Sequence, residues 1–108
     1  MKGAYLGAFE ELVLLAVEAL GDQAYSANLQ RVLERETRRA ISLGAVHTVL
    51  ERLGAKGLLT SMVSEPINER GGRRRRIYVA TREGRAALKD INAVRERLAT
   101  IRMAPRRG

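Results

Sequence analysis

The sequence Ser42-Leu43-Gly44-Ala45-Val46-His47-Thr48-Val49-Leu50-Glu51-Arg52-Leu53 predicts a helix, and the residues that follow it as far as Tyr78 predict a hairpin. Ser42 is a favoured N-cap residue. Val46, Val49, Leu50 and Leu53 follow the i, i+3, i+4, i+7 spacing of a helix with one buried face. Lys56-Gly57 ends the helix, with Gly57 placed for the left-handed conformation and Leu58 placed to touch Leu53.

The residues after this helix predict two short strands joined by a basic loop. The strands span residues 58–64 and 75–80, and five arginines fall within seven residues at Arg70 and 73–76, around Gly71-Gly72. A solvated charged loop is one interpretation. The run carries one sign of charge, however, and a Gly-Gly turn lets the backbone approach a ligand closely. Arginines at a hairpin tip can bridge phosphates or enter a narrow minor groove of DNA.

A shorter helix is predicted before Ser42, with Ser26 as its N-cap and its end near Thr37. Arg38 and Arg39 lie in the connection between the two helices. This arrangement matches a helix-turn-helix, in which the second helix enters the major groove, although many helix corners look alike. With the hairpin added, we predict an α+β, mostly helical fold of the winged helix-turn-helix type.

The outward face of the Ser42 helix begins with small, uncharged residues. Gly44, Thr48 and Glu51 point away from the apolar face, with Ala45 and His47 on its flanks. Lys and Glu are the usual residues on a purely solvated face, whereas small residues suit a helix end that must come close to another surface. A lone surface histidine is more often merely solvated, so His47 is weak evidence by itself.

The first predicted helix, residues 6–20, carries an unusually broad apolar stripe. Its members are Phe9, Leu12, Val13, Ala16, Val17 and Leu20, widened by Leu14 and Leu15. We expect Glu10, Glu11 and Glu18 to mark its solvated side. The stripe either forms the chain's own core or also packs against a second subunit.

The last predicted helix runs from Arg82 to about Met103, with Thr81 as its N-cap. Its apolar residues repeat at the 3-4-3-4 spacing of a coiled-coil seam: Gly84, Ala87, Ile91, Val94, Leu98 and Ile101. The seam is too short to stand alone, so we predict that it packs on the first helix across a homodimer. Residues 1–80 would then form the DNA-binding domain, and 81–108 a dimerisation helix with a basic tail.

The length, charge and residue types of the chain limit the partners and the classes of protein to consider. The 108 residues suffice for one domain with a modest core, and 20 Lys+Arg against 12 Asp+Glu give a formal charge of +8. Such an excess favours a polyanionic partner. No apolar run approaches the roughly 20 residues that span a bilayer, and no signal peptide or cysteine is present, so we expect a cytoplasmic protein. One histidine and no grouped carboxylates offer neither a nucleophile–base pair nor a metal site, so we expect no enzyme, no metal and no cofactor.

Five segments together resemble the PadR-like transcriptional regulators, over about residues 6–90. The segments are residues 9–15, 24–26, 42–46, 50–58 and 71–76. The resemblance implies a winged helix-turn-helix repressor that dimerises through its terminal helices and binds a promoter palindrome. Many relatives respond to small molecules such as phenolics or cationic drugs, so an effector of unknown identity is a further partner to consider. The chain has no tryptophan to line a drug pocket, and it carries His47 where relatives usually have tyrosine.

We therefore predict a sequence-specific regulator of double-stranded DNA, and the alternative is a non-specific architectural DNA-binding protein. The predicted DNA-binding residues are Arg38, Arg39, Ser42, Gly44, Ala45, His47, Thr48, Arg73, Arg74 and Arg75. The predicted dimer-interface residues are Phe9, Leu12, Val13, Ala87, Ile91, Val94, Leu98 and Ile101. An operator preference would separate the two hypotheses.

Overall fold

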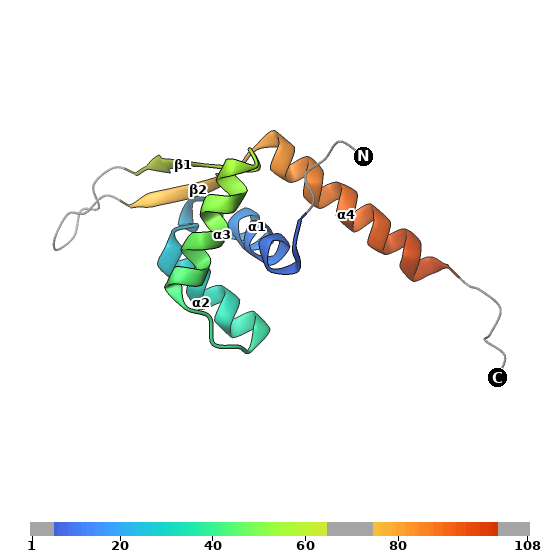
Figure 1. Cartoon of the computed structure of the whole chain (residues 1–108), viewed down its shortest axis with the longest axis horizontal. Helices are drawn as coiled ribbons and strands as arrows, with labels where there is room; N and C mark the ends of the chain where they lie inside the picture. Colours follow the sequence, from blue (N-terminus) through green and yellow to red (C-terminus); the bar gives the residue numbers. More distant parts are fainter. Residues whose placement is uncertain (1–5, 65–74, 102–108) are drawn as a thin grey trace.

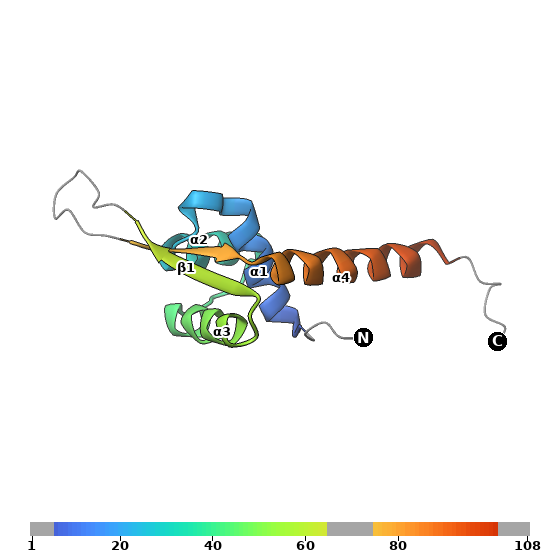
Figure 2. The ribbon, with the colours of Figure 1, turned by 90° about the horizontal axis from the view of Figure 1, so that it is seen from above.

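The computed structural model describes residues 6–64 and 75–101 of the chain. This part is mostly helical and carries a two-stranded antiparallel sheet. Helices α1, α2 and α3 pack together, while the hairpin and α4 extend from opposite ends of this group (Figure 1; Figure 2). The elements are α1 (Ala8–Leu20), the 3-10 turn η1 (Gly21–Gln23), α2 (Ser26–Thr37), α3 (Leu43–Ala55), β1 (Leu59–Val63), β2 (Arg76–Ala80) and α4 (Arg82–Thr100).

Both ends of α3 confirm the prediction. At the start, Ser42 Oγ accepts a hydrogen bond from Ala45 N at 3.0 Å. At the end, Gly57 has φ +75°, Leu58 N donates to Leu53 O at 2.9 Å, and Gly57 N donates to Gly54 O at 3.0 Å. These two bonds form a Schellman motif, which satisfies the last carbonyls of the helix.

The sheet is tied to the segment that precedes α2. Strand β1 pairs with β2 from Leu59↔Ala80 to Val63↔Arg76, and Leu59 and Ala80 are buried in the core. On the other edge of β2, Tyr78 N donates to Ala24 O at 2.9 Å. This single bond holds the residues just before α2 against the hairpin.

Helix α2 begins one residue away from its predicted cap. Ser26 is its first residue, and the N-cap is Tyr25, which makes no side-chain capping bond in the described structure. Asn28 Nδ2 instead donates to Gln23 O at 3.0 Å, from inside the first turn. The prediction that Ser26 caps the helix was therefore wrong.

Helix α4 begins in close contact with the turn after α3. Thr81 caps it as predicted, accepting from Gly84 N at 3.0 Å, and Thr81 Oγ1 also donates to Gly57 O at 2.7 Å. Gly84, Ala87 and Leu88 are the buried residues of α4. The helix ends at Thr100, earlier than the predicted end near Met103, which lies outside the described residues.

Two of the three glutamates expected on the solvated side of α1 are buried. Glu10 Oε1 accepts from Gly7 N at 2.8 Å and from Lys56 Nζ at 2.7 Å. The hydrogen bond from Lys56 outweighs burial and holds the pKa of the Glu10 carboxyl below its usual value. Glu11 receives both terminal nitrogens of Arg95 in a fork-like ion pair that joins α1 to α4. The partners of both residues lie far away in the sequence, so the local pattern misassigned them.

Among the described residues, no helix combines the length and the apolar character that crossing a membrane requires.

Candidate nucleic-acid interface

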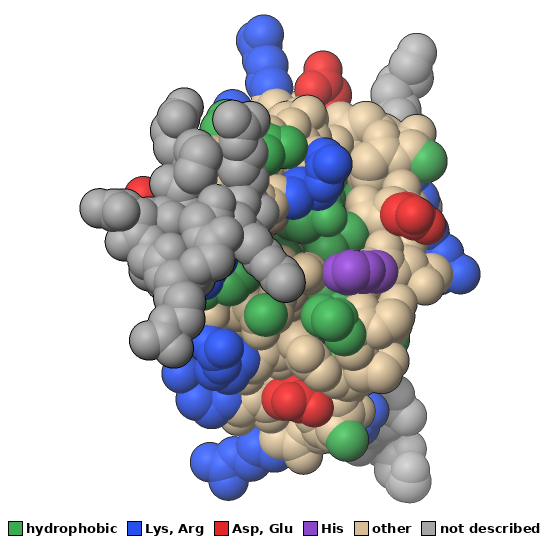
Figure 3. All heavy atoms as spheres, turned by 90° about the vertical axis from the view of Figure 1, so that its left-hand side faces the viewer, with side chains coloured by type: hydrophobic (Ala, Val, Ile, Leu, Met, Phe, Trp, Pro, Cys, Tyr) green, Lys and Arg blue, Asp and Glu red, His purple; other side chains and the backbone are tan. Residues whose placement is uncertain are grey.

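Helix α3 presents its small residues to solvent and its apolar residues to the core. Val46, Val49, Leu50 and Leu53 are buried. The five predicted contact residues of its N-terminal part are all exposed: Ser42, Gly44, Ala45, His47 and Thr48. Figure 3 shows the chain's one histidine on the face toward which the hairpin projects. The structure therefore brings the predicted residues of α3 together on one accessible surface.

A hollow of about 280 Å³ separates α3 from the hairpin. His47 and Glu51 line it from α3, and Ser61, Arg76 and Tyr78 line it from the strands. Arg76 Nη1 donates to Ser61 Oγ at 3.0 Å across the two strands. Arg76 was absent from the predicted contacts, although the alternation of side chains along a strand could have distinguished it from Arg75.

Arg75 is held at the outer end of the hairpin strands, just before β2. Its guanidinium carbon lies 4.2 Å from the centroid of the Tyr25 ring, in a cation–π contact. Its backbone N donates to Ser64 Oγ at 3.0 Å, and its carbonyl accepts from Ser64 N at 2.7 Å. Arg73 and Arg74, predicted beside it as DNA contacts, lie outside the described residues.

The connection between α2 and α3 is fixed by side chains of α2. Glu34 Oε2 accepts from Ile41 N at 2.9 Å, and Gln30 Nε2 donates to Ile41 O at 2.8 Å. These two supports were not identified from the sequence, because the partner of both side chains, Ile41, lies beyond the end of the helix. Arg38 stands at the end of α2 with φ +59° and ψ +37°, a left-handed conformation, and is exposed.

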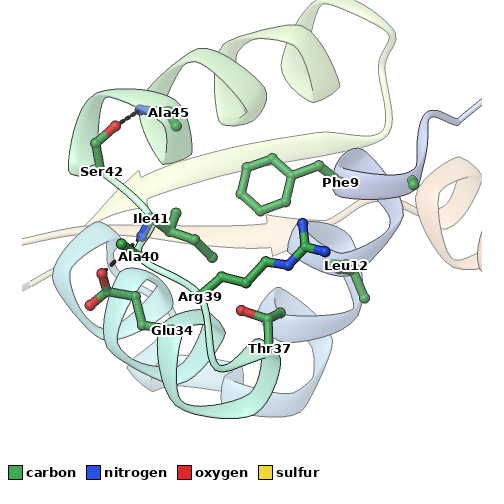
Figure 4. Close-up of a pocket in the computed structure, with 10 residues that line it drawn as sticks. Phe9, Leu12, Glu34, Thr37, Arg39, Ala40, Ile41, Ser42 and Ala45 are labelled. Atoms are coloured by element: carbon green, nitrogen blue, oxygen red, sulfur yellow. Dashed lines mark hydrogen bonds between the residues drawn. The ribbon is translucent and has the colours of Figure 1, made fainter.

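Arg39, which was predicted with Arg38 to contact DNA, extends over a groove between α1 and this connection (Figure 4). The groove has a volume of about 1060 Å³. Phe9 and Leu12 line its α1 side, and Ile41 lines the opposite side. It is thus a largely apolar surface that reaches the N-terminus of α3 through Ser42 and Ala45.

The predicted dimer-interface residues fall into three groups, which differ in how far the single chain buries them. Val13 is fully buried and Ala87 is 7% exposed within the single chain. These two positions therefore belong to the chain's own core, which corrects their assignment to an interface. Phe9 and Ile91 are partly buried against that core. Exposed apolar side chains remain at Leu12, Val94, Leu98 and Ile101.

Within the described ranges, no three His, Cys, Asp or Glu side chains are grouped as metal ligands would be.

The chain is similar in sequence to one protein family and in fold to several solved structures. The sequence model described as "Transcriptional regulator PadR-like family" matches residues 14–90. A PadR-like regulator from Bacillus cereus has a TM-score of 0.69 at 20% identity, over 87% of this chain and 86% of that one. A PadR family regulator from Clostridium difficile gives 0.62 at 24%, over 82% and 90%. One from Eggerthella lenta gives 0.60 at 27%, over 82% and 74%. A comparison with curated proteins finds no match.

Proposed function

The chain belongs to the PadR-like family of transcriptional regulators, and from this premise we propose that it acts in the cytoplasm as a homodimeric repressor on a palindromic operator. Membership of the family implies regulation through DNA binding. The homodimer, the operator symmetry and repression are our proposal. Two-fold symmetry in the protein calls for two-fold symmetry in the site, and a dimer bound at a promoter represses by occluding it.

The observation that carries the proposal is the outward face of α3. Between Gly44 and Thr48, its exposed face carries only Ala45 and His47, while the opposite face is buried in the core. Small residues at the start of a helix let its backbone lie close to the base edges when the helix enters the major groove. We assign Gly44, Ala45, His47 and Thr48 to the bases and Ser42 to the adjoining backbone.

Arginines around α3 supply the electrostatic part of the proposed interface. Arg38 is exposed at the end of α2, and Arg39 follows it over the groove that reaches the N-terminus of α3. We assign both to phosphates on one side of the site. We assign Arg73 and Arg74 of the loop to phosphates or the minor groove on the other side. The net charge of +8 supports an anionic partner of this kind.

The homodimer is supported by two unmatched apolar surfaces in one chain. Leu98 is 63% exposed and Ile101 is 51% exposed near the end of α4. The groove beside α1 offers Phe9, Leu12 and Ile41. We propose that α4 of one copy packs along α1 of the other and reaches this groove. Residues 1–80 then serve as the DNA-binding domain and 81–108 as the dimerisation segment.

Selection of bound duplexes from random DNA tests the proposal. The expected result is an enriched palindrome whose half-site centres lie about 34 Å apart, one turn of DNA, or a multiple of it. Gly44→Leu should remove the enrichment, because the larger side chain keeps α3 away from the bases. Ala55→Leu, exposed at the far end of the same helix, is the matched control and should retain it. Binding without any enriched sequence would instead support the alternative, a non-specific architectural protein.

A further inference from the structure

Arg75 and Arg76 are neighbours in the sequence with the same charge, but they meet different parts of the molecule. Successive side chains of an extended strand point to opposite faces. Arg76 contacts Ser61 on the face that lines the hollow beside α3. Arg75 contacts the Tyr25 ring, at the start of α2. The two arginines are therefore not equivalent members of one basic run.

We propose that Arg75 is a positioning residue, which fixes the hairpin to α2 through Tyr25, and that it is not a DNA contact. This inference rests on the proposed function, because it concerns how the hairpin is held against DNA. It changes the assignment of one arginine that the sequence alone places among the DNA contacts. The partner of Arg75 is the aromatic face of Tyr25, and the role of Arg75 is to set the direction of the hairpin.

The backbone around both residues is already constrained, so the side-chain contact has a defined geometry. Arg75 is joined to Ser64 by two hydrogen bonds, which close the base of the loop. On the other side, Tyr25 O accepts from Leu29 N at 2.9 Å, in the first turn of α2. Both Tyr25 and Arg75 are partly buried. A cation over a ring in such a setting loses part of its hydration, which strengthens the contact.

The Arg75–Tyr25 contact adds to a hydrogen bond that already joins the hairpin to the segment before α2. That bond joins Tyr78 N to Ala24 O at 2.9 Å, in the middle of β2. The burial of Leu59 and Ala80 holds the inner end of the hairpin, whereas the outer part of a two-stranded ribbon has little stability of its own. The Arg75–Tyr25 contact lies farther out, at the end of the strand. With its outer end also attached, the hairpin has a set direction relative to α2, and through α2 relative to α3.

A double-mutant cycle separates a positioning role from a phosphate contact. The variants are Arg75→Ala, Tyr25→Leu and both together, and the measurement is affinity for a selected duplex and a random duplex across a salt series. We expect each single change to lower the affinity about three-fold to ten-fold, from the size of a cation–π contact. The double variant should lose no more than either single one, because all three lose the same contact. The salt slope, which is the slope of log affinity against log salt concentration, should stay unchanged. Loss of one phosphate contact would instead reduce the magnitude of this slope by about 0.9.

Arg76→Ala is the matched control, since it removes the same charge from the adjacent position without touching Tyr25. Its effect should add to that of Tyr25→Leu. Tyr25→Phe keeps the aromatic face and should restore the affinity that Tyr25→Leu loses. If the hydroxyl of Tyr25 were the important group, Tyr25→Phe would lose as much affinity as Tyr25→Leu. If Arg75→Ala lowers the salt slope and its effect adds to that of Tyr25→Leu, Arg75 is a DNA contact and the inference is wrong.

A measurement without DNA keeps this test independent of the proposed function. Protons of the Arg75 side chain that lie over the ring should show upfield NMR shifts in the wild type and in Tyr25→Phe. Tyr25→Leu should remove them. If the protein shows these upfield shifts but binds no DNA, the proposed function is wrong, while the Arg75–Tyr25 contact is confirmed. Arg75 resonances at unshifted positions in the wild type would overturn the inference, whatever the protein binds.

Discussion

Gly84 lies so close to the backbone of Leu58 that a Cβ atom built on the glycine would stand 2.1 Å from the Leu58 carbonyl oxygen. The same oxygen accepts a hydrogen bond from Thr81 N at 3.0 Å. The carbonyl therefore cannot move away without disturbing the first turn of α4. Position 84 requires glycine because α4 starts directly against the turn that ends α3.

Gly84→Ala should destabilise the protein by about 3 kcal/mol, the upper part of the range for overpacking a core. The added methyl group collides with backbone, which cannot rotate aside as a side chain can. Urea unfolding followed by circular dichroism measures the change. Gly54→Ala is the control: its nearest neighbour would lie 3.9 Å from the new Cβ, so the better helix propensity of alanine should stabilise α3 by up to about 1 kcal/mol. Equal stability of both variants would contradict the close contact.

The ion pair between Glu10 and Lys56 predicts a specific dependence of stability on pH. Lys56 lowers the pKa of Glu10 below its ordinary 4.5, so the folded state favours the ionised carboxylate. This contribution is fully present above pH 4.5 and is lost as the pH falls through the lower, folded-state pKa. Glu10→Gln should therefore cost about 1 kcal/mol near neutral pH, and the difference from wild type should shrink in acid.

Urea unfolding of both proteins between neutral and acidic pH measures this difference. Glutamine keeps an acceptor for Gly7 N, so the comparison isolates the charge. Glu18→Gln, exposed on the same helix, corrects for the general effect of removing one carboxylate from α1. A cost for Glu10→Gln that stayed constant down to strongly acidic pH would show that the pair contributes nothing through charge.

Arg38 combines backbone strain with a proposed DNA contact. A non-glycine residue in the left-handed region costs about 1–2 kcal/mol, and glycine relieves this at a smaller entropic cost. Arg38→Gly should therefore raise the free energy of unfolding by about 0.5–1 kcal/mol. The same variant should bind DNA more weakly, with a salt slope lower by about 0.9. Arg38→Asn, which also tolerates this conformation, should show the same loss of slope. A retained slope would remove Arg38 from the interface.

The double variant Leu98→Glu with Ile101→Glu should be a folded monomer. Both side chains are exposed in the single chain, so charges there cost little within one copy but disrupt packing on a second. Sedimentation gives the mass, and circular dichroism shows whether the helices persist. Thr100→Glu adds a charge between the two, off the apolar stripe, and should leave a dimer. A dimer that survives the double change would refute the proposed packing of α4.

Elements fixed by local signals were predictable from the sequence. The N-cap at Ser42, the glycine at 57 and the cap at Thr81 act within one helical turn, so their residue types suffice to place both ends of α3 and the start of α4. The strands also lie where the pattern placed them, to within one residue at each end. The exposed face of α3 followed from the same helical spacing.

Relationships between distant residues could not be predicted in the same way. Glu10 finds its partner 46 residues away and Glu11 finds its partner 84 residues away, so a solvated face was the natural expectation for both. A helical stripe shows which residues are buried, but it does not say whether the covering surface belongs to the same chain. Val13 and Ala87 were therefore placed with the interface, although the chain's own core covers them. The contact of Arg75 with Tyr25 likewise depends on tertiary structure.

The ion pair of Glu11 with Arg95 also has a consequence for how the protein is made. Chains are synthesised from the N-terminus, and folding begins before synthesis is complete. On the ribosome, Glu11 is added 84 residues before Arg95, so its carboxylate has no guanidinium donor until the last helix is made. Anything that halts translation ahead of Arg95 leaves that carboxylate without this partner and the first helix less firmly held. The attachment of the first helix is therefore completed only when the last helix has been made.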